Sequence, residues 1–96
     1  MTRDEVVRLL QAHRDELYAL GARSVSLFGS VARDEAGPES DIDVLVEFEG
    51  KPDFDRYMTL LMYLEELLAR RVDLSTPGMV REEFLPYVER DIVRVA

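Results

Sequence analysis

The chain is organised around two neighbouring segments, Phe28-Gly29-Ser30-Val31-Ala32-Arg33 and Ser40-Asp41-Ile42-Asp43. Their order predicts a strand end, a tight turn, a short helical turn over residues 30–36 and a second strand. The turn offers backbone N–H groups and a hydroxyl, which suit phosphate oxygens. Alternate strand residues share a face, so Asp41 and Asp43 would present two oxygen ligands for Mg²⁺ side by side. This combination predicts metal-dependent transfer from a nucleoside triphosphate.

The composition fits one small domain, residues 1–96, with a thin two-layer core. A net charge of −8 argues against a broad nucleic-acid surface, because phosphate backbones bind to basic footprints. No apolar run approaches the ~20 residues of a membrane span, and the charged start, Met1–Glu5, lacks the apolar core of a signal peptide. Since the chain also has no cysteine, we expect a cytoplasmic protein with no membrane partner.

The first segment of the chain has the apolar spacing of an amphipathic helix, predicted over residues 3–20. Thr2 and Glu5 have the spacing of a capping box at its start. His13 lies on the apolar stripe of this helix. Because the chain has no second histidine, we expect His13 to be packed or partly buried rather than a ligand or a catalytic base.

A longer amphipathic helix is predicted over Phe54–Arg70. Besides its main apolar stripe it carries a second, narrower stripe formed by Met58, Met62 and Ala69. This stripe either widens the face that packs on the core or forms a surface for a partner, since methionine suits adaptable interfaces.

Strands are predicted over Arg23–Phe28, Ile42–Phe48 and Val72–Leu74, where apolar residues alternate with others. The remainder, residues 81–96, reads as helical, although its last five residues fit a helix or a strand equally well. These elements predict an α+β fold, in which a small three-stranded mixed sheet has helices packed on one face. The opposite face would carry the aspartates of the second and third strands.

The spacing of Gly29-Ser30, ten residues and then Asp41-Ile42-Asp43 resembles the signature of the nucleotidyltransferase superfamily of the polymerase-beta type. The residues around this signature are most similar to the minimal nucleotidyltransferases (MNT), the antitoxin-like partners of HEPN-domain proteins. Val72-Asp73-Leu74 resembles the third acidic strand of that family. The resemblance covers about residues 5–75.

The resemblance implies a Mg²⁺-dependent enzyme that transfers a nucleoside monophosphate, AMP from ATP, to a hydroxyl acceptor and releases pyrophosphate. Asp41, Asp43 and Asp73 would bind two Mg²⁺ ions, and Asp73 would also lower the pKa of the acceptor or take its proton. Three residues would hold the nucleotide phosphates: Gly29, Ser30 and Arg33.

Several of these residues have plainer interpretations. Arg33 could instead pair with Asp34 or Glu35, and Ser30 could simply cap the helical turn. Glu47 shares a strand face with the aspartates, but it is more simply a solvated edge charge than a ligand. Asp73 could likewise be a surface residue.

The acceptor implied by the resemblance is a hydroxyl, a tyrosine for example, on a HEPN-type ribonuclease toxin, so the chain would act as an antitoxin. We expect another protomer or protein to complete the nucleotide pocket, because 96 residues leave no room for the extra helical domain of larger relatives. Two alternatives remain. The chain could be a non-catalytic module that inhibits its partner by binding, or it could modify a small molecule.

Overall fold

The computed structural model describes residues 1–96. Its helices and strands follow in the order α1 (Arg3–Ala12), α2 (Arg14–Ala19), β1 (Ala22–Leu27), α3 (Gly29–Ala32), β2 (Ile42–Phe48), α4 (Phe54–Leu68), β3 (Val72–Ser75), η1 (Pro77–Met79), η2 (Glu82–Phe84), α5 (Leu85–Asp91) and β4 (Val93–Arg94). The sheet has the strand order β3-β2-β1-β4. β1 pairs antiparallel with β2 and β4, and β2 pairs parallel with β3. The α+β class and the mixed sheet are therefore confirmed.

The prediction of three strands is wrong, because the C-terminal residues add a fourth. Val93 pairs with Leu27 of β1, and the pairing continues beyond β4, where the N–H of Val95 donates to the carbonyl oxygen of Val25 at 2.9 Å. Val95 is buried against the core. The strand of two residues has too little alternation for a sequence pattern to reveal it, and its partner lies almost 70 residues away in the chain.

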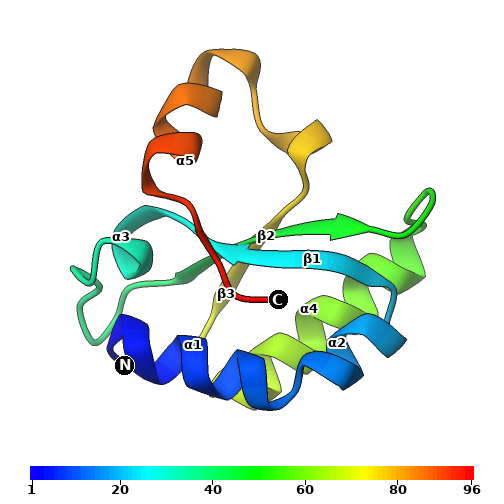
Figure 1. The fold of residues 1–96 in the computed structure, drawn as a ribbon, viewed down its shortest axis with the longest axis horizontal. Coiled ribbons are helices and arrows are strands. Elements are labelled where there is room, and N and C mark those ends of the chain that lie inside the picture. The colour runs from blue at the N-terminus through cyan, green and yellow to red at the C-terminus, as the bar shows by residue number, and fades with distance from the viewer.

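Helices α1, α2 and α4 lie on one side of the sheet, whereas the segment from η1 to α5 arches over the other side (Figure 1). On β2, Ile42, Val44 and Val46 are fully buried, and Phe48 at the end of the strand is partly buried. The three fully buried residues form one hydrophobic cluster with the buried apolar residues of α1, α2 and α4. The opposite face of β2 therefore remains available for polar side chains. No helix combines the length and the apolar composition that crossing a bilayer requires.

The helix predicted over residues 3–20 is broken at His13 into α1 and α2. The ring Nδ1 of His13 lies 2.9 Å from the carbonyl oxygen of Leu9, which would otherwise accept the backbone N–H of His13. That N–H turns to Leu10 instead, at 3.1 Å. The half-buried position of His13 is as predicted, and the capping box of Thr2 and Glu5 is present at the start of α1.

Two other elements end earlier than predicted. α4 stops at Leu68 because Ala69 takes a left-handed conformation, with φ of 53°. α3 is four residues long, and Asp34 ends its turn with φ of 59°. Met62 on α4 is 64% exposed, so the interpretation of its stripe as part of the core face is wrong at this residue.

Candidate active site

The site begins at the corner where β1 turns into α3 beside β2. The N–H of Phe28 donates to the carbonyl oxygen of Asp43 at 3.1 Å, which places Gly29 against the Asp43 side chain. Gly29 has φ of +67°, a conformation that L side chains rarely adopt. A Cβ at residue 29 would overlap Oδ2 of Asp43 and lie 3.1 Å from its Cγ. The glycine therefore leaves room for a carboxylate next to the turn.

Asp43 and Asp73 face each other across the parallel pair of β2 and β3. Asp43 is half-buried and Asp73 is exposed, and the charge of Asp73 acts on the carboxyl group of Asp43. The pKa of Asp43 is raised to about 6, first by burial and then by the negative charges of Asp73 and Asp41, against a smaller opposing effect of Arg33. Near neutral pH the Asp43 carboxylate is therefore half-buried, and the nearby positive charge of Arg33 does not offset its burial and the negative charges of its neighbours.

Asp41 directly precedes β2, so it does not share the strand with Asp43 as predicted. Its side chain is 48% exposed, and its Oδ1 is 3.9 Å from Nε of Arg71. No group of three or more His, Cys, Asp or Glu side chains is arranged to hold a metal ion in the structure. The donor chemistry nevertheless fits Mg²⁺, which prefers carboxylate oxygens. A divalent cation would also neutralise the charge that raises the pKa of Asp43.

The two other candidate residues for binding phosphates lie at the two ends of α3. Ser30 sits in its first turn, after the N-cap position held by Phe28, so Ser30 is not the cap of this turn. Arg33 pairs through Nε with Glu35 at 3.1 Å and through Nη1 with Asp91 of α5 at 2.7 Å. The pairing with Glu35 anticipated as an alternative is thus present, and Glu47 is exposed as expected.

Three features of the site were not predicted. Asp91, only 12% exposed, ties the C-terminal segment to Arg33, and no local pattern links these two residues in the sequence. The Tyr57 hydroxyl of α4 donates to the carbonyl oxygen of Leu74, next to Asp73 in β3. Arg70 and Arg71 line a cavity beside Asp41. Their place directly before Val72-Asp73 was a signal that could have been used.

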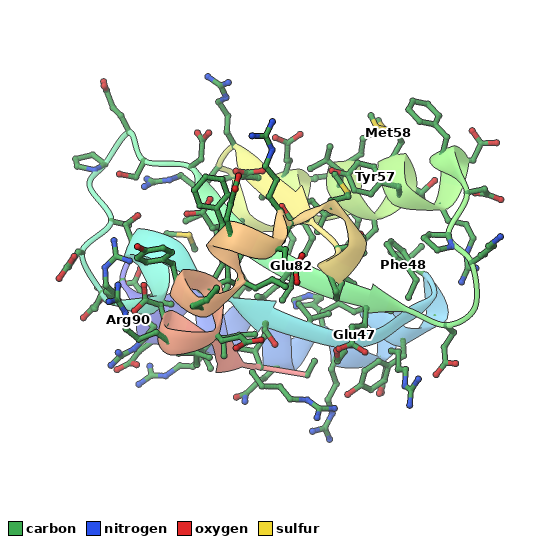
Figure 2. All side chains as sticks on the ribbon, turned by 90° about the horizontal axis from the view of Figure 1, so that it is seen from above. Glu47, Phe48, Tyr57, Met58, Glu82 and Arg90 are labelled. Atoms are coloured by element: carbon green, nitrogen blue, oxygen red, sulfur yellow. The ribbon has the colours of Figure 1, made fainter.

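Figure 2 looks onto the face of the sheet that carries the aspartates. The C-terminal segment, marked by Glu82 and Arg90, lies across this face, whereas Tyr57 and Met58 mark α4 along the edge beyond β3. The C-terminal segment therefore covers part of this face.

The model of the nucleotidyltransferase domain family matches residues 8–94. The chain belongs to this family. It is 38% identical over 96 residues to the protein adenylyltransferase MntA of Thermococcus cleftensis, an alignment that covers 99% of this chain and 97% of the relative. It is also 39% identical over 94 residues to a candidate protein adenylyltransferase of Methanocaldococcus jannaschii, covering 95% and 91% of the two chains. The chain is therefore a nucleotidyltransferase.

Solved structures agree with this membership. The structure of a candidate minimal nucleotidyltransferase superposes on this chain with a TM-score of 0.84 at 32% identity, covering 97% of this chain and 95% of the other. A toxin–antitoxin structure with AMP-PNP gives a TM-score of 0.72 at 22% identity, covering 100% and 73%. The complex of a tri-AMPylated Shewanella oneidensis HEPN toxin with an MNT antitoxin gives 0.61 at 20% identity, covering 90% and 71%. The last two likenesses show the fold alone.

Proposed function

We propose that this nucleotidyltransferase transfers AMP from ATP to a hydroxyl of a HEPN-type protein partner in a Mg²⁺-dependent reaction, and that it acts as an antitoxin in the cytoplasm. The observation that carries the proposal is the pair of Asp43 and Asp73, which lie opposite each other on β2 and β3 with Asp43 against the Gly29 corner. The relatives named as protein adenylyltransferases support the reaction class. The structural neighbour that pairs an MNT antitoxin with a tri-AMPylated HEPN toxin supports the kind of partner.

In the proposed reaction the acceptor oxygen forms a bond to the α-phosphorus of ATP. The bond to the bridging oxygen breaks, pyrophosphate leaves with the electron pair, and the proton of the acceptor hydroxyl goes to Asp73. Two Mg²⁺ ions held by Asp41, Asp43 and Asp73 would neutralise the charge that develops on the phosphates. Gly29 and Ser30 would hold the leaving phosphates, since the first turn of α3 offers backbone N–H groups and a hydroxyl.

Arg33 would contact the same phosphates after its guanidinium leaves Asp91 or turns a free N–H toward the ligand. Arg33 is the C-cap residue of α3, and its positive charge partly offsets the rise in the pKa of Asp43. Guanidinium groups bind phosphate in two-point contacts that are stronger than a single surface ion pair. The pairing of Arg33 with Asp91 therefore does not prevent the role in nucleotide binding.

A second candidate function is inhibition of the partner by binding alone. It is favoured by the absence of a preformed metal-binding group in the structure. It is also favoured by the exposed Met62 on α4, which suits a protein interface. In this case the aspartates would be dispensable for protection of the cell.

A labelling assay, combined with a test of cell protection, separates the two functions. The chain is incubated with Mg²⁺, ATP labelled at the α-phosphate and a HEPN-domain protein from the same genome, and label on that protein is measured. We expect labelling by the wild type and by Glu47→Gln, a control on the exposed part of the same strand face. Asp43→Asn should abolish labelling and leave the complex intact. If Asp43→Asn protects cells as well as the wild type, inhibition by binding is the function and the catalytic proposal fails.

A further inference from the structure

We propose that the cavity formed by Arg70, Arg71 and the loop before β2 is a subsite for an anionic group of the acceptor, a phosphate or a carboxylate. This inference rests on the proposed function, because it assigns the side from which the acceptor reaches the carboxylates. The cavity has a volume of about 450 Å³. Its lining joins two turns that are far apart in the sequence: Pro38, Glu39, Ser40 and Asp41 from one, and Ala69, Arg70 and Arg71 from the other.

The walls of the cavity are fixed by hydrogen bonds. On one side the carbonyl oxygen of Gly37 accepts from the N–H of Ser40 at 3.1 Å and from Nη2 of Arg70 at 2.9 Å. The Ser40 hydroxyl oxygen accepts in turn from the N–H of Gly37 at 3.0 Å. At the base, the N–H of Ile42 donates to the carbonyl oxygen of Arg71 at 2.9 Å. The cavity is therefore held in shape before any ligand enters it.

The two arginines are available to a ligand. The chain has 20 acidic residues against 12 basic ones, yet the half-buried Arg70 guanidinium contacts a carbonyl oxygen and no carboxylate. Arg71 has a side chain that is 87% exposed, and its one ionic contact is to Asp41 at 3.9 Å, longer than a hydrogen bond. Guanidinium groups bind carboxylate and phosphate oxygens through paired N–H donors. The cavity thus offers two guanidinium groups to an oxyanion.

The strand order places this cavity on the side from which an acceptor should come. In-line transfer puts the incoming hydroxyl and the leaving pyrophosphate on opposite sides of the α-phosphorus. Gly29 lies on the β1 side of β2, and Asp73 and Arg71 lie on its β3 side. With the pyrophosphate at the Gly29 corner, the acceptor hydroxyl arrives from the β3 side. An oxyanion bound at Arg70 and Arg71 would anchor the acceptor beside Asp41.

The test uses the full chain with its nucleotide site filled by Mg²⁺ and α,β-methylene-ATP, which cannot be cleaved at the reacting bond. Inorganic phosphate is then added, and NMR follows the backbone amides of residues 38–41 and 69–71 together with the arginine Nε–H signals. We expect saturable shifts at these positions. Arg71→Gln should weaken phosphate binding at least about tenfold, the effect of losing one charge-assisted contact. The exposed Arg8→Ala on α1 should leave it unchanged.

A parallel titration with succinate distinguishes the two sources of the anion. Tighter binding of phosphate indicates a phosphorylated acceptor, and comparable binding of succinate indicates an acidic segment. In the labelling assay, Arg71→Gln should raise KM for the protein acceptor and leave KM for ATP unchanged. Phosphate binding that survives Arg71→Gln, or shifts confined to residues 29–30, would overturn the inference. If the nucleotide analogue does not bind, the proposed function fails, whereas the phosphate titration without nucleotide still tests the cavity.

Discussion

Asp43→Asn should stabilise the unliganded protein at neutral pH while it removes the activity. The pKa of Asp43 is raised from 3.8 to about 6, mainly by burial and then by Asp73. At about 1.4 kcal/mol per pH unit this rise corresponds to about 3 kcal/mol in favour of the neutral carboxyl group. Because the side chain is only half-buried, solvent screening reduces the effect, and we expect about 1–2 kcal/mol. For a domain of this size that is an increase in Tm of about 5–10 °C.

The pH dependence of the stability gain shows whether the gain comes from removing the charge of Asp43. A carboxyl group with a raised folded pKa destabilises the fold fully above that pKa, and the penalty disappears as the pH falls below the unfolded value. Urea unfolding should therefore show the full advantage of Asp43→Asn at pH 7.5, a partial one near pH 5 and almost none near pH 3.5. Glu66→Gln, an exposed change on α4, should stay within about 0.5 kcal/mol of wild type at each pH. An advantage that is independent of pH, or a loss of stability at pH 7.5, would refute this reasoning.

Three further changes test the surroundings of the site. Gly29→Ala should cost at least about 1–2 kcal/mol of unfolding free energy and abolish labelling of the partner, because φ is positive and a Cβ would overlap Asp43; stability and activity equal to wild type would contradict it. Tyr57→Phe should cost about 1 kcal/mol in urea unfolding through loss of the hydrogen bond to Leu74, and an unchanged midpoint would show that this bond does not hold β3. Met62→Lys should weaken association with the HEPN partner without changing the Tm, and an unchanged mass of the complex by light scattering would exclude this face as an interface.

The parts of the site that depend on local pattern were predictable from the sequence. Alternation along β2 placed Ile42 in the core and Asp43 on the opposite face, and a turn at Gly29 followed from the Gly-Ser pair. The third strand was predicted because Val72 and Leu74 flank Asp73. What the pattern could not supply was the parallel register that sets Asp43 opposite Asp73, since register is fixed by contacts between distant segments.

The features that were missed are also non-local or depend on one side chain. β4 exists because Val93 meets the edge of β1, and Asp91 reaches Arg33 only after α5 has crossed the sheet. At the break between α1 and α2, the ring of His13 contacts the Leu9 carbonyl oxygen while the backbone N–H of His13 donates to Leu10. No glycine or proline, the residues that normally mark a break in a sequence, lies at the junction of α1 and α2.

The central claim is that the aspartates bind a nucleotide through divalent cations, and a calorimetric titration with α,β-methylene-ATP tests it most directly. Titrations are run in Mg²⁺ and in EDTA on the wild type and on Asp43→Asn and Asp73→Asn. We predict that Mg²⁺ tightens binding by at least about tenfold in the wild type, and that both substitutions remove this gain. Binding of equal strength in Mg²⁺ and EDTA, or a gain that survives both substitutions, would contradict the account.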